Sequence, residues 1–346
     1  MTNSLLSCMT LSIGSVPFTD VGQTMELLGK YVDIPASPQL VHLSPWEDML
    51  LGAVDGIDFV EADGQSHVLS VPLLAREEKL TSFYEKYYSG DYSFLARSER
   101  AGLGFYSFLE KAKSSASFGK DFLKTQVVGP LTFGQSVKVE GSFNLVDDPG
   151  LLEASALALG AKVAWEAQAI RELGRNPVVF LDEPGLTGYG SAFSTLSQEV
   201  VLTALNNSIS AARSLGPVYV GIHVCGNTDW GLLTQAELDI INCDAFDYLE
   251  SVSLYPKELK AFLERGGYLA WGIVPTQGFD KRFTALELSK RLNLGFKDLE
   301  RRGVERGLLL ERVLITSSCG LGSLTSEVAT RVLELLPEVK RELLNL

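Results

Sequence analysis

Cysteine and histidine are scarce in this sequence. Its 346 residues include four cysteines, at positions 8, 225, 243 and 319, and three histidines. Cysteines this few and this widely spaced do not form a disulfide framework, which is typical of small secreted domains. We therefore expect a reducing, cytoplasmic location, in which a cysteine with a function binds a metal or takes part in catalysis.

The sequence also lacks a long apolar run and an excess of basic residues. No uninterrupted apolar stretch approaches the roughly 20 residues that span a bilayer, and residues 1–4 contain no basic segment of a secretory signal. Thirty Lys and Arg against 43 Asp and Glu give a formal net charge of −13. Because phosphate groups bind to cationic surfaces, this balance argues against nucleic acid and anionic membrane as partners.

Internal repeats and low-complexity tracts are absent as well, so nothing in the sequence divides it. Short apolar, β-branched runs alternate with helical segments, a pattern that predicts parallel strands joined by helical crossovers. The pattern is least regular over residues 55–120. We predict strands at residues 11–16, 39–42, 126–128, 178–181, 218–224, 240–243, 268–271 and 313–315, and helices at 152–173, 198–215, 258–265 and 325–344, the last interrupted at Pro337.

About eight strand–helix units in this length favour a closed barrel over an open sheet. The prediction is one α/β domain, a (β/α)₈ TIM-type barrel over residues 1–346. In such barrels the active site lies at the carboxyl ends of the strands.

The most informative stretch reads Gly-Ile-His-Val-Cys-Gly-Asn at residues 221–227. His223 and Cys225 stand two residues apart at the end of an apolar strand, so their side chains point to the same face. An imidazole and a thiolate side by side are natural zinc ligands. A buried structural pair is the alternative interpretation of this short motif.

Further ligands are expected from two other strand ends. Cys319 follows a late apolar strand and enters a glycine-rich turn, so it would reach the same rim. Asp244 ends the strand that follows His223 and could supply a fourth, carboxylate ligand, with Glu250 as its competitor. Cys8 and Cys243 have no such partners and are interpreted as packing residues.

The charge of this ligand set favours one kind of chemistry. One histidine, two thiolates and a carboxylate leave a zinc site with net negative charge, which is a poor Lewis acid toward water. Such a site suits the binding and activation of a substrate thiol. The sequence therefore indicates thiol alkylation, with no catalytic group beyond the zinc-bound substrate thiolate.

In its motifs the chain resembles the catalytic domain of cobalamin-independent methionine synthase. That family belongs to a superfamily with uroporphyrinogen decarboxylase and the methylcobamide:coenzyme M methyltransferases. Five motifs in family order carry the resemblance: Leu-Ser-Ile-Gly-Ser-Val-Pro at 11–17, Gly-Pro-Leu-Thr at 129–132, Leu-Asp-Glu-Pro at 181–184, His-Val-Cys-Gly-Asn at 223–227 and Cys-Gly-Leu at 319–321.

The resemblance implies particular roles in binding L-homocysteine. The backbone of Ile13, Gly14 and Ser15 would meet the substrate carboxylate, and Asp182 would bind the amino group. In the family the fourth zinc ligand is a glutamate at the end of the next strand, and Asp244 takes that place here.

Two departures from the family bear on the methyl donor. The first-strand motif begins at residue 11, so the long N-terminal half of the conventional enzyme is expected to be absent. The family's late-strand histidine, which helps to protonate the folate nitrogen as the methyl leaves, is missing, because residues 267–275 read Gly-Tyr-Leu-Ala-Trp-Gly-Ile-Val-Pro. Cob(I)alamin leaves without a proton. The interpretation is a short core methionine synthase that uses a methyl-corrinoid, methylcobalamin on a carrier protein.

Several alternatives stay open from the sequence. The acceptor could be coenzyme M or another thiol, although a sulfonate would need a cationic pocket and would not need Asp182. A uroporphyrinogen decarboxylase-like enzyme would leave the zinc-type residues unexplained, and a non-catalytic zinc-binding module would leave the substrate motifs unexplained. Trp271 could line a corrinoid or substrate site, or could pack in the core.

Overall fold

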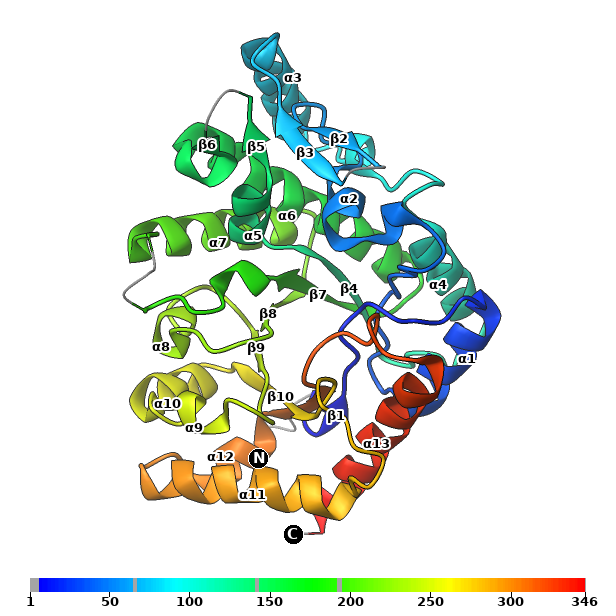
Figure 1. Ribbon diagram of the computed structural model, residues 1–346, viewed down its shortest axis with the longest axis vertical. Coiled ribbons are helices and arrows are strands. Elements are labelled where there is room, and N and C mark those ends of the chain that lie inside the picture. The colour runs from blue at the N-terminus through cyan, green and yellow to red at the C-terminus, as the bar shows by residue number, and fades with distance from the viewer. Residues whose placement is uncertain (1–5, 65–66, 141–142, 192–194, 346) are drawn as a thin grey trace.

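The computed structural model describes residues 6–64, 67–140, 143–191 and 195–345. In these residues seven parallel strands form one curved sheet, in the order β1-β11-β10-β9-β8-β7-β4 (Figure 1). The strands are β1 (Met9–Thr10), β4 (Phe122–Val128), β7 (Asn176–Asp182), β8 (Tyr219–Val224), β9 (Ile240–Cys243), β10 (Tyr268–Val274) and β11 (Val313–Ser317).

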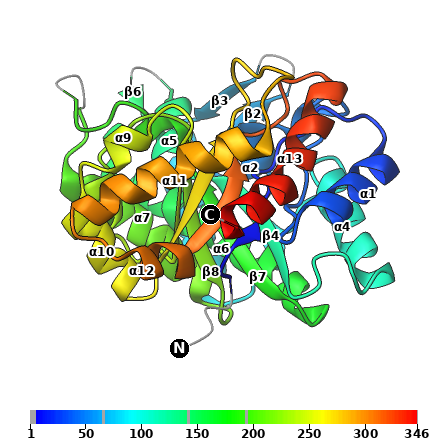
Figure 2. The ribbon, with the colours of Figure 1, turned by 90° about the horizontal axis from the view of Figure 1, so that it is seen from below.

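Helices surround this sheet, and α11 and α13 lie side by side along one flank (Figure 2). No helix in the described residues is long and apolar enough to cross a bilayer. The helices are α1 (Val21–Tyr31), α2 (Met49–Val54), α3 (Arg76–Tyr88), α4 (Leu103–Ser114), α5 (Pro130–Ser136), α6 (Pro149–Glu172), α7 (Gln198–Arg213), α8 (Trp230–Leu233), α9 (Leu249–Val252), α10 (Pro256–Glu264), α11 (Ala285–Arg301), α12 (Arg306–Glu311) and α13 (Ser326–Leu344).

A second, smaller sheet lies at one end of the molecule together with α3 (Figure 1). Its order is β2-β3-β5-β6, from β2 (Glu61–Asp63), β3 (Val68–Val71), β5 (Lys138–Val139) and β6 (Phe143–Asn144). Residues 55–120, where the sequence pattern is irregular, contain the short strands β2 and β3, the helices α3 and α4 and the turns between them. Short 3₁₀ helices complete the described secondary structure: Pro45–Glu47, Ser93–Leu95, Leu145–Asp147 and Pro184–Leu186.

The arrangement is consistent with a TIM-like fold, but the sheet has seven strands and does not close into the predicted eight-stranded barrel. The first strand, predicted at 11–16, lies earlier, as β1 at Met9–Thr10. The predicted strand at 39–42 is absent. Instead, residues 34–39 run between β1 and β4 and make only single parallel bridges, Leu11 to Ile34, Ser15 to Gln39 and Ala36 to Lys124. The sequence of this segment explains the interruption, since Pro35 and Pro38 have no N–H to donate to a ladder.

Residues on the inner face of the sheet change character along each strand. Apolar residues such as Phe122, Val178, Phe180, Ile240 and Leu314 form one buried cluster. Side chains alternate between faces along a strand, so residues two or four positions further along lie on the same face, and there they are polar. The polar layer consists of Gln126, Asp182, His223, Asn242 and Thr316, all buried. A buried polar layer thus lies toward the carboxyl ends of the strands.

The four predicted helices are present as α6, α7, α10 and α13. The expected interruption at Pro337 is wrong, because α13 continues through it. Leu333, Leu336 and Val339 on either side of the proline are fully buried against the sheet and its neighbours. Apolar packing on both sides of Pro337 holds the helix together despite the lost backbone hydrogen bond.

Trp271 and Cys243 point outward from the sheet into the helical layer. Both are fully buried, and the Trp271 ring meets the ring of Phe296 on α11 at 5.5 Å between centroids. Trp271 is therefore a packing residue and does not line the rim. Cys243 is a packing residue, as the alternation of the strand predicts.

Candidate active site

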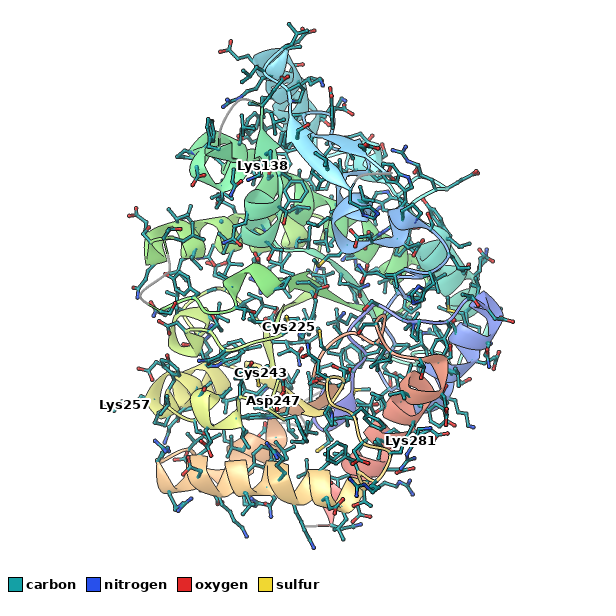
Figure 3. The ribbon with its side chains drawn as sticks, viewed as in Figure 1. Lys138, Cys225, Cys243, Asp247, Lys257 and Lys281 are labelled. Carbon is teal, nitrogen blue, oxygen red and sulfur yellow. The ribbon has the colours of Figure 1, made fainter. Side chains whose placement is uncertain are left out.

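His223, Cys225 and Cys319 come together at the carboxyl ends of β8 and β11. One ligand atom from each residue lies within 4.8 Å of the others. Figure 3 shows Cys225 near the middle of the molecule, where the strands end. Two segments almost 100 residues apart in the chain are brought together because both end at the same rim of one parallel sheet.

Hydrogen bonds fix which nitrogen of His223 is free. The Asn242 Nδ2 group donates to the Ala270 carbonyl at 2.7 Å and to Thr316 Oγ1 at 2.8 Å, so Asn242 Oδ1 is left as an acceptor. His223 Nδ1 lies 2.5 Å from that oxygen and must carry the proton. His223 Nε2 is buried and has no hydrogen-bond partner in the described residues, so this nitrogen is unprotonated and carries a free lone pair.

Burial lowers the pKa of His223 to about 4, although the bond to Asn242 works in the opposite direction. The imidazole is therefore neutral at physiological pH, as a metal ligand must be. An orphaned, neutral ring nitrogen inside a protein is costly unless something binds it. This atom is the strongest local indication that the site holds a metal.

The two thiols form a pair. The pKa of Cys225 is lowered to about 6, chiefly by a hydrogen bond from Cys319, and the pKa of Cys319 is raised by the same bond. The turn that carries Cys319 is fixed by Ser317, whose hydroxyl donates to the Cys319 carbonyl at 2.8 Å. One imidazole nitrogen and two sulfurs in this arrangement fit Zn²⁺, which prefers such ligands.

Neither predicted carboxylate ligand joins this cluster. Asp244 Oδ1 accepts hydrogen bonds from the backbone N–H groups of Phe246 at 2.9 Å and Asp247 at 3.0 Å, and so organises the turn after β9. Burial raises the pKa of Asp244 to about 6. Glu250 is exposed on α9. Asp244 is close enough to disfavour the Cys225 thiolate electrostatically, and its role as a fourth ligand stays a prediction.

Asp182 lies next to His223 in the sheet register, at the end of β7. Its Oδ1 atom is buried and has no hydrogen-bond partner in the described residues. Burial raises the pKa of Asp182 to about 7, against the lowering effect of Lys124, and Cys225 raises it further. An unpaired carboxylate oxygen beside the thiols is suited to binding a cation.

The neighbouring Glu183 explains two of the sequence motifs. Its carboxylate accepts the backbone N–H groups of Leu131 at 3.0 Å and Thr132 at 2.8 Å, and the Thr132 hydroxyl at 2.5 Å. Gly129 leaves the space for it, since a Cβ there would lie 2.2 Å from Glu183. The Gly-Pro-Leu-Thr motif is thus a capped helix start that anchors the strand end carrying Asp182.

The predicted carboxylate-binding segment lies beside the Cys319 turn. The Ser15 carbonyl accepts the Leu321 N–H at 2.8 Å, and Ser15 Oγ accepts the Gly322 N–H at 3.3 Å. Within the described residues the N–H groups of Ile13, Gly14 and Ser15 donate to no acceptor. Unpaired backbone N–H groups of this segment are available as donors to an anionic ligand.

The sequence interpretation missed several residues of this site. Asn242 is the only polar residue of β9 with its side chain buried among apolar strands, and that position was its signal. Lys124 and Gln126 are buried polar residues on β4.

His42 is exposed, and its Nε2 lies 3.1 Å from the Gly322 carbonyl. No sequence spacing links His42 to Gly322, because the contact depends on the irregular segment that precedes His42.

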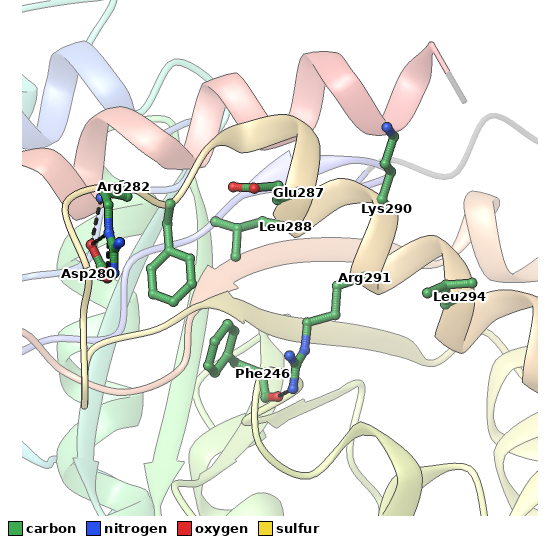
Figure 4. Close-up of a pocket in the computed structure, with 9 residues that line it drawn as sticks. Phe246, Asp280, Arg282, Glu287, Leu288, Lys290, Arg291 and Leu294 are labelled. Carbon is green, nitrogen blue, oxygen red and sulfur yellow. Dashed lines mark hydrogen bonds and ion pairs between the residues drawn. The ribbon is translucent and has the colours of Figure 1, made fainter.

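A surface cleft of about 740 Å³ lies outside this cluster, between the turn after β9 and α11 (Figure 4). Its two arginines have partners: Arg282 pairs with Asp280, and Arg291 donates to the Phe246 carbonyl. No buried, unpartnered polar atom of the described residues lines it. The lining of this cleft therefore indicates no ligand, in contrast to the cluster around His223.

Comparison with solved structures finds a similar fold in a B12-independent methionine synthase from Shewanella sp. W3-18-1 in complex with selenomethionine. The TM-score is 0.58 at 16% sequence identity, and the match covers 98% of this chain and 100% of that chain. No protein-family model matches the sequence, and no curated protein matches it. A likeness at this identity supports the fold expected from the five motifs.

Replacing Asn242 tests how the imidazole is held. In Asn242→Ala the His223 ring loses the acceptor that fixes its tautomer, so zinc affinity should fall roughly 10- to 100-fold. Competition with a chromogenic chelator measures this. Cys243→Ala, one residue away on the opposite face of the strand, is the matched control and should keep the wild-type affinity. Equal zinc affinity in both variants would show that Asn242 does not position the ligand.

Proposed function

We propose that this chain is a zinc-dependent methyltransferase that transfers a methyl group to the thiol of L-homocysteine and forms methionine. One observation supports this above others. A His-Cys-Cys cluster with a buried histidine and half-buried cysteines, an unpaired carboxylate oxygen and three backbone N–H groups without an acceptor in the described residues share one rim. These groups complement the thiol, the ammonium and the carboxylate of one amino acid.

Each group of the chain has a distinct task in this proposal. His223, Cys225 and Cys319 would hold the zinc, which when bound lowers the pKa of a coordinated thiol and so makes it a nucleophile at neutral pH. Asp182 binds the substrate ammonium, and the N–H groups of residues 13–15 bind the carboxylate. With both ends of the amino acid held, its side chain carries the sulfur toward the cluster, and orientation supplies much of the rate.

The charge of the cluster favours this reaction over hydrolysis. Two cysteine sulfurs and a neutral imidazole would offset the charge of the metal and weaken its polarisation of water. The same charge leaves a thiolate electron-rich and reactive toward a methyl group. The burial of His223 and Asp182 keeps bulk water away from the reacting atoms.

Competing acceptors and functions fit these residues less well. A sulfonate thiol such as coenzyme M has no ammonium for Asp182 and brings a second anion toward it. A decarboxylase of the uroporphyrinogen type has no use for the cluster of His223, Cys225 and Cys319. A non-catalytic zinc-binding module has no use for the unpaired Asp182 oxygen. The similar Shewanella structure, solved with selenomethionine, agrees with an amino-acid ligand.

For the donor we propose a methyl-corrinoid, delivered by a carrier protein. Methyl transfer from a folate needs a proton on the leaving nitrogen, and β10, where the family places a histidine for this, has none. Cob(I)alamin leaves without a proton, so a methyl-corrinoid needs no acid from the chain.

Two observations favour the folate as the second candidate donor. His42 reaches Gly322, three residues after Cys319, and so brings an exposed imidazole toward the rim. The similar Shewanella protein is described as B12-independent. His42 would then be the proton donor that β10 lacks.

A donor assay separates these candidates. Zinc-loaded protein with L-homocysteine is expected to form methionine from free methylcobalamin and not from methyltetrahydrofolate, with methionine measured by mass spectrometry. Turnover with the folate that falls about 100-fold or more in His42→Gln would replace the corrinoid proposal by the folate one. Methionine from neither donor, with zinc bound, would count against the proposed reaction with free donors.

Asp182→Asn tests the ammonium contact. Loss of a hydrogen bond to a charged group should weaken L-homocysteine binding roughly 10- to 100-fold. 4-Mercaptobutanoate, which is homocysteine without its ammonium, should bind the variant no more weakly than it binds the wild type. Calorimetric titration of the zinc-loaded proteins gives both affinities. An unchanged affinity for homocysteine would remove the role assigned to Asp182.

A further inference from the structure

We infer that Lys124 orients the Gly14 amide that binds the substrate carboxylate, and so makes the site selective for amino-acid thiols. The inference rests on the proposed function, because it concerns how that same site recognises its acceptor. Lys124 is a positioning residue in this account. It acts through the Ile13–Gly14 peptide group and does not touch the reacting sulfur.

Lys124 lies on the inner face of β4, below the polar layer. The residue is fully buried, and its Nζ is 4.6 Å from the centroid of the Phe180 ring. Nζ donates to the Ile13 carbonyl and to Gln126 Oε1, the latter at 3.0 Å. Burial of an ammonium group costs desolvation free energy, so packing alone does not explain why a lysine occupies this position.

The geometry of a peptide group connects Lys124 to Gly14. The Ile13 carbonyl and the Gly14 N–H belong to one planar unit, and the described residues contain no cis peptide bond. In a trans peptide the C=O and N–H point in opposite directions. Lys124 holds the carbonyl from below the polar layer, on the inner face of the sheet, so the Gly14 N–H points away from Lys124. That N–H has no acceptor in the described residues and is available to a ligand.

This segment needs such support because regular sheet bonding ends here. Residues 11–15 make only single bridges to the proline-containing segment 34–39. Side chains of β4 replace the missing ladder on both sides: Lys124 holds the Ile13 carbonyl, and Gln126 Nε2 donates to the Ser37 carbonyl at 2.7 Å. A cation on the carbonyl also polarises the peptide group and strengthens its N–H as a donor.

A lysine that only stabilised the fold would affect all ligands alike. One that orients the carboxylate site has its larger effect on ligands with a carboxylate. Two thiols make this comparison: L-homocysteine, and 3-aminopropane-1-thiol, which keeps the thiol and ammonium and lacks the carboxylate.

The experiment is calorimetric titration of zinc-loaded wild type and Lys124→Met with both thiols, with zinc content measured in each sample. Lys124→Met should weaken homocysteine binding roughly 10- to 100-fold. Loss of Lys124 also removes its effect on Asp182, which both thiols share through their ammonium, so homocysteine binding should weaken at least about 10-fold more than binding of 3-aminopropane-1-thiol. Lys162→Met is the matched control, since Lys162 is also fully buried and donates to the Asp55 carbonyl at 2.5 Å and the Leu95 carbonyl at 3.1 Å, outside the site. It should leave both affinities unchanged.

Equal losses for the two thiols, or no loss for either, would overturn the role of Lys124 while leaving the proposed function intact. A wild-type protein that binds no homocysteine would instead contradict the proposed function itself. If Lys124→Met does not fold, Lys124→Arg keeps a cation near the Ile13 carbonyl. That variant should keep the preference for homocysteine over 3-aminopropane-1-thiol, and loss of the preference would overturn the inference.

Discussion

The hydrogen bond between Asn242 and His223 is the interaction on which the candidate site depends. Asn242 is itself held by the Ala270 carbonyl and by Thr316, so its oxygen can only accept. The proton of the imidazole is thereby placed on Nδ1, and Nε2 keeps a free lone pair on a ring that lies beside the two thiols. Residues of three neighbouring strands, β9, β10 and β11, thus determine which ring nitrogen of His223 on β8 is unprotonated.

The same rim contains other groups left without partners, and each has a physical cost. The Asp182 carboxylate oxygen has no hydrogen-bond partner in the described residues, and the Ile13, Gly14 and Ser15 N–H groups lie where the ladder to segment 34–39 is reduced to single bridges. Unpaired buried polar groups destabilise a fold unless a ligand satisfies them. Their gathering around one cluster is the reason to interpret them as one substrate site.

Much of this arrangement could be predicted from the sequence because it follows from strand periodicity. The i, i+2 spacing of His223 and Cys225 and the apolar strand before Cys319 place all three at one rim, and the residues of β9 were predicted without error. Asp244 shows the limit. The sequence places its carboxylate at a strand end, where it could bind a metal or cap a turn, and only the structure shows that Asp244 Oδ1 accepts the N–H groups of Phe246 and Asp247.

The gap in the sheet between β1 and β4, where a closed barrel was predicted, could not be predicted either. A short apolar segment resembles a strand, but Pro35 and Pro38 reduce it to single bridges, and the compensating bonds from Lys124 and Gln126 come from more than 80 residues away. Contacts of that kind depend on which strands become neighbours. They are properties of the assembled fold and leave no local pattern in the sequence.

X-ray absorption spectroscopy at the zinc edge tests the central claim most directly. In zinc-loaded protein the account predicts two sulfur ligands and one histidine nitrogen from the chain, and a third sulfur once L-homocysteine is added. Unchanged sulfur coordination in the presence of saturating L-homocysteine would contradict the claim that the cluster of His223, Cys225 and Cys319 activates a substrate thiol.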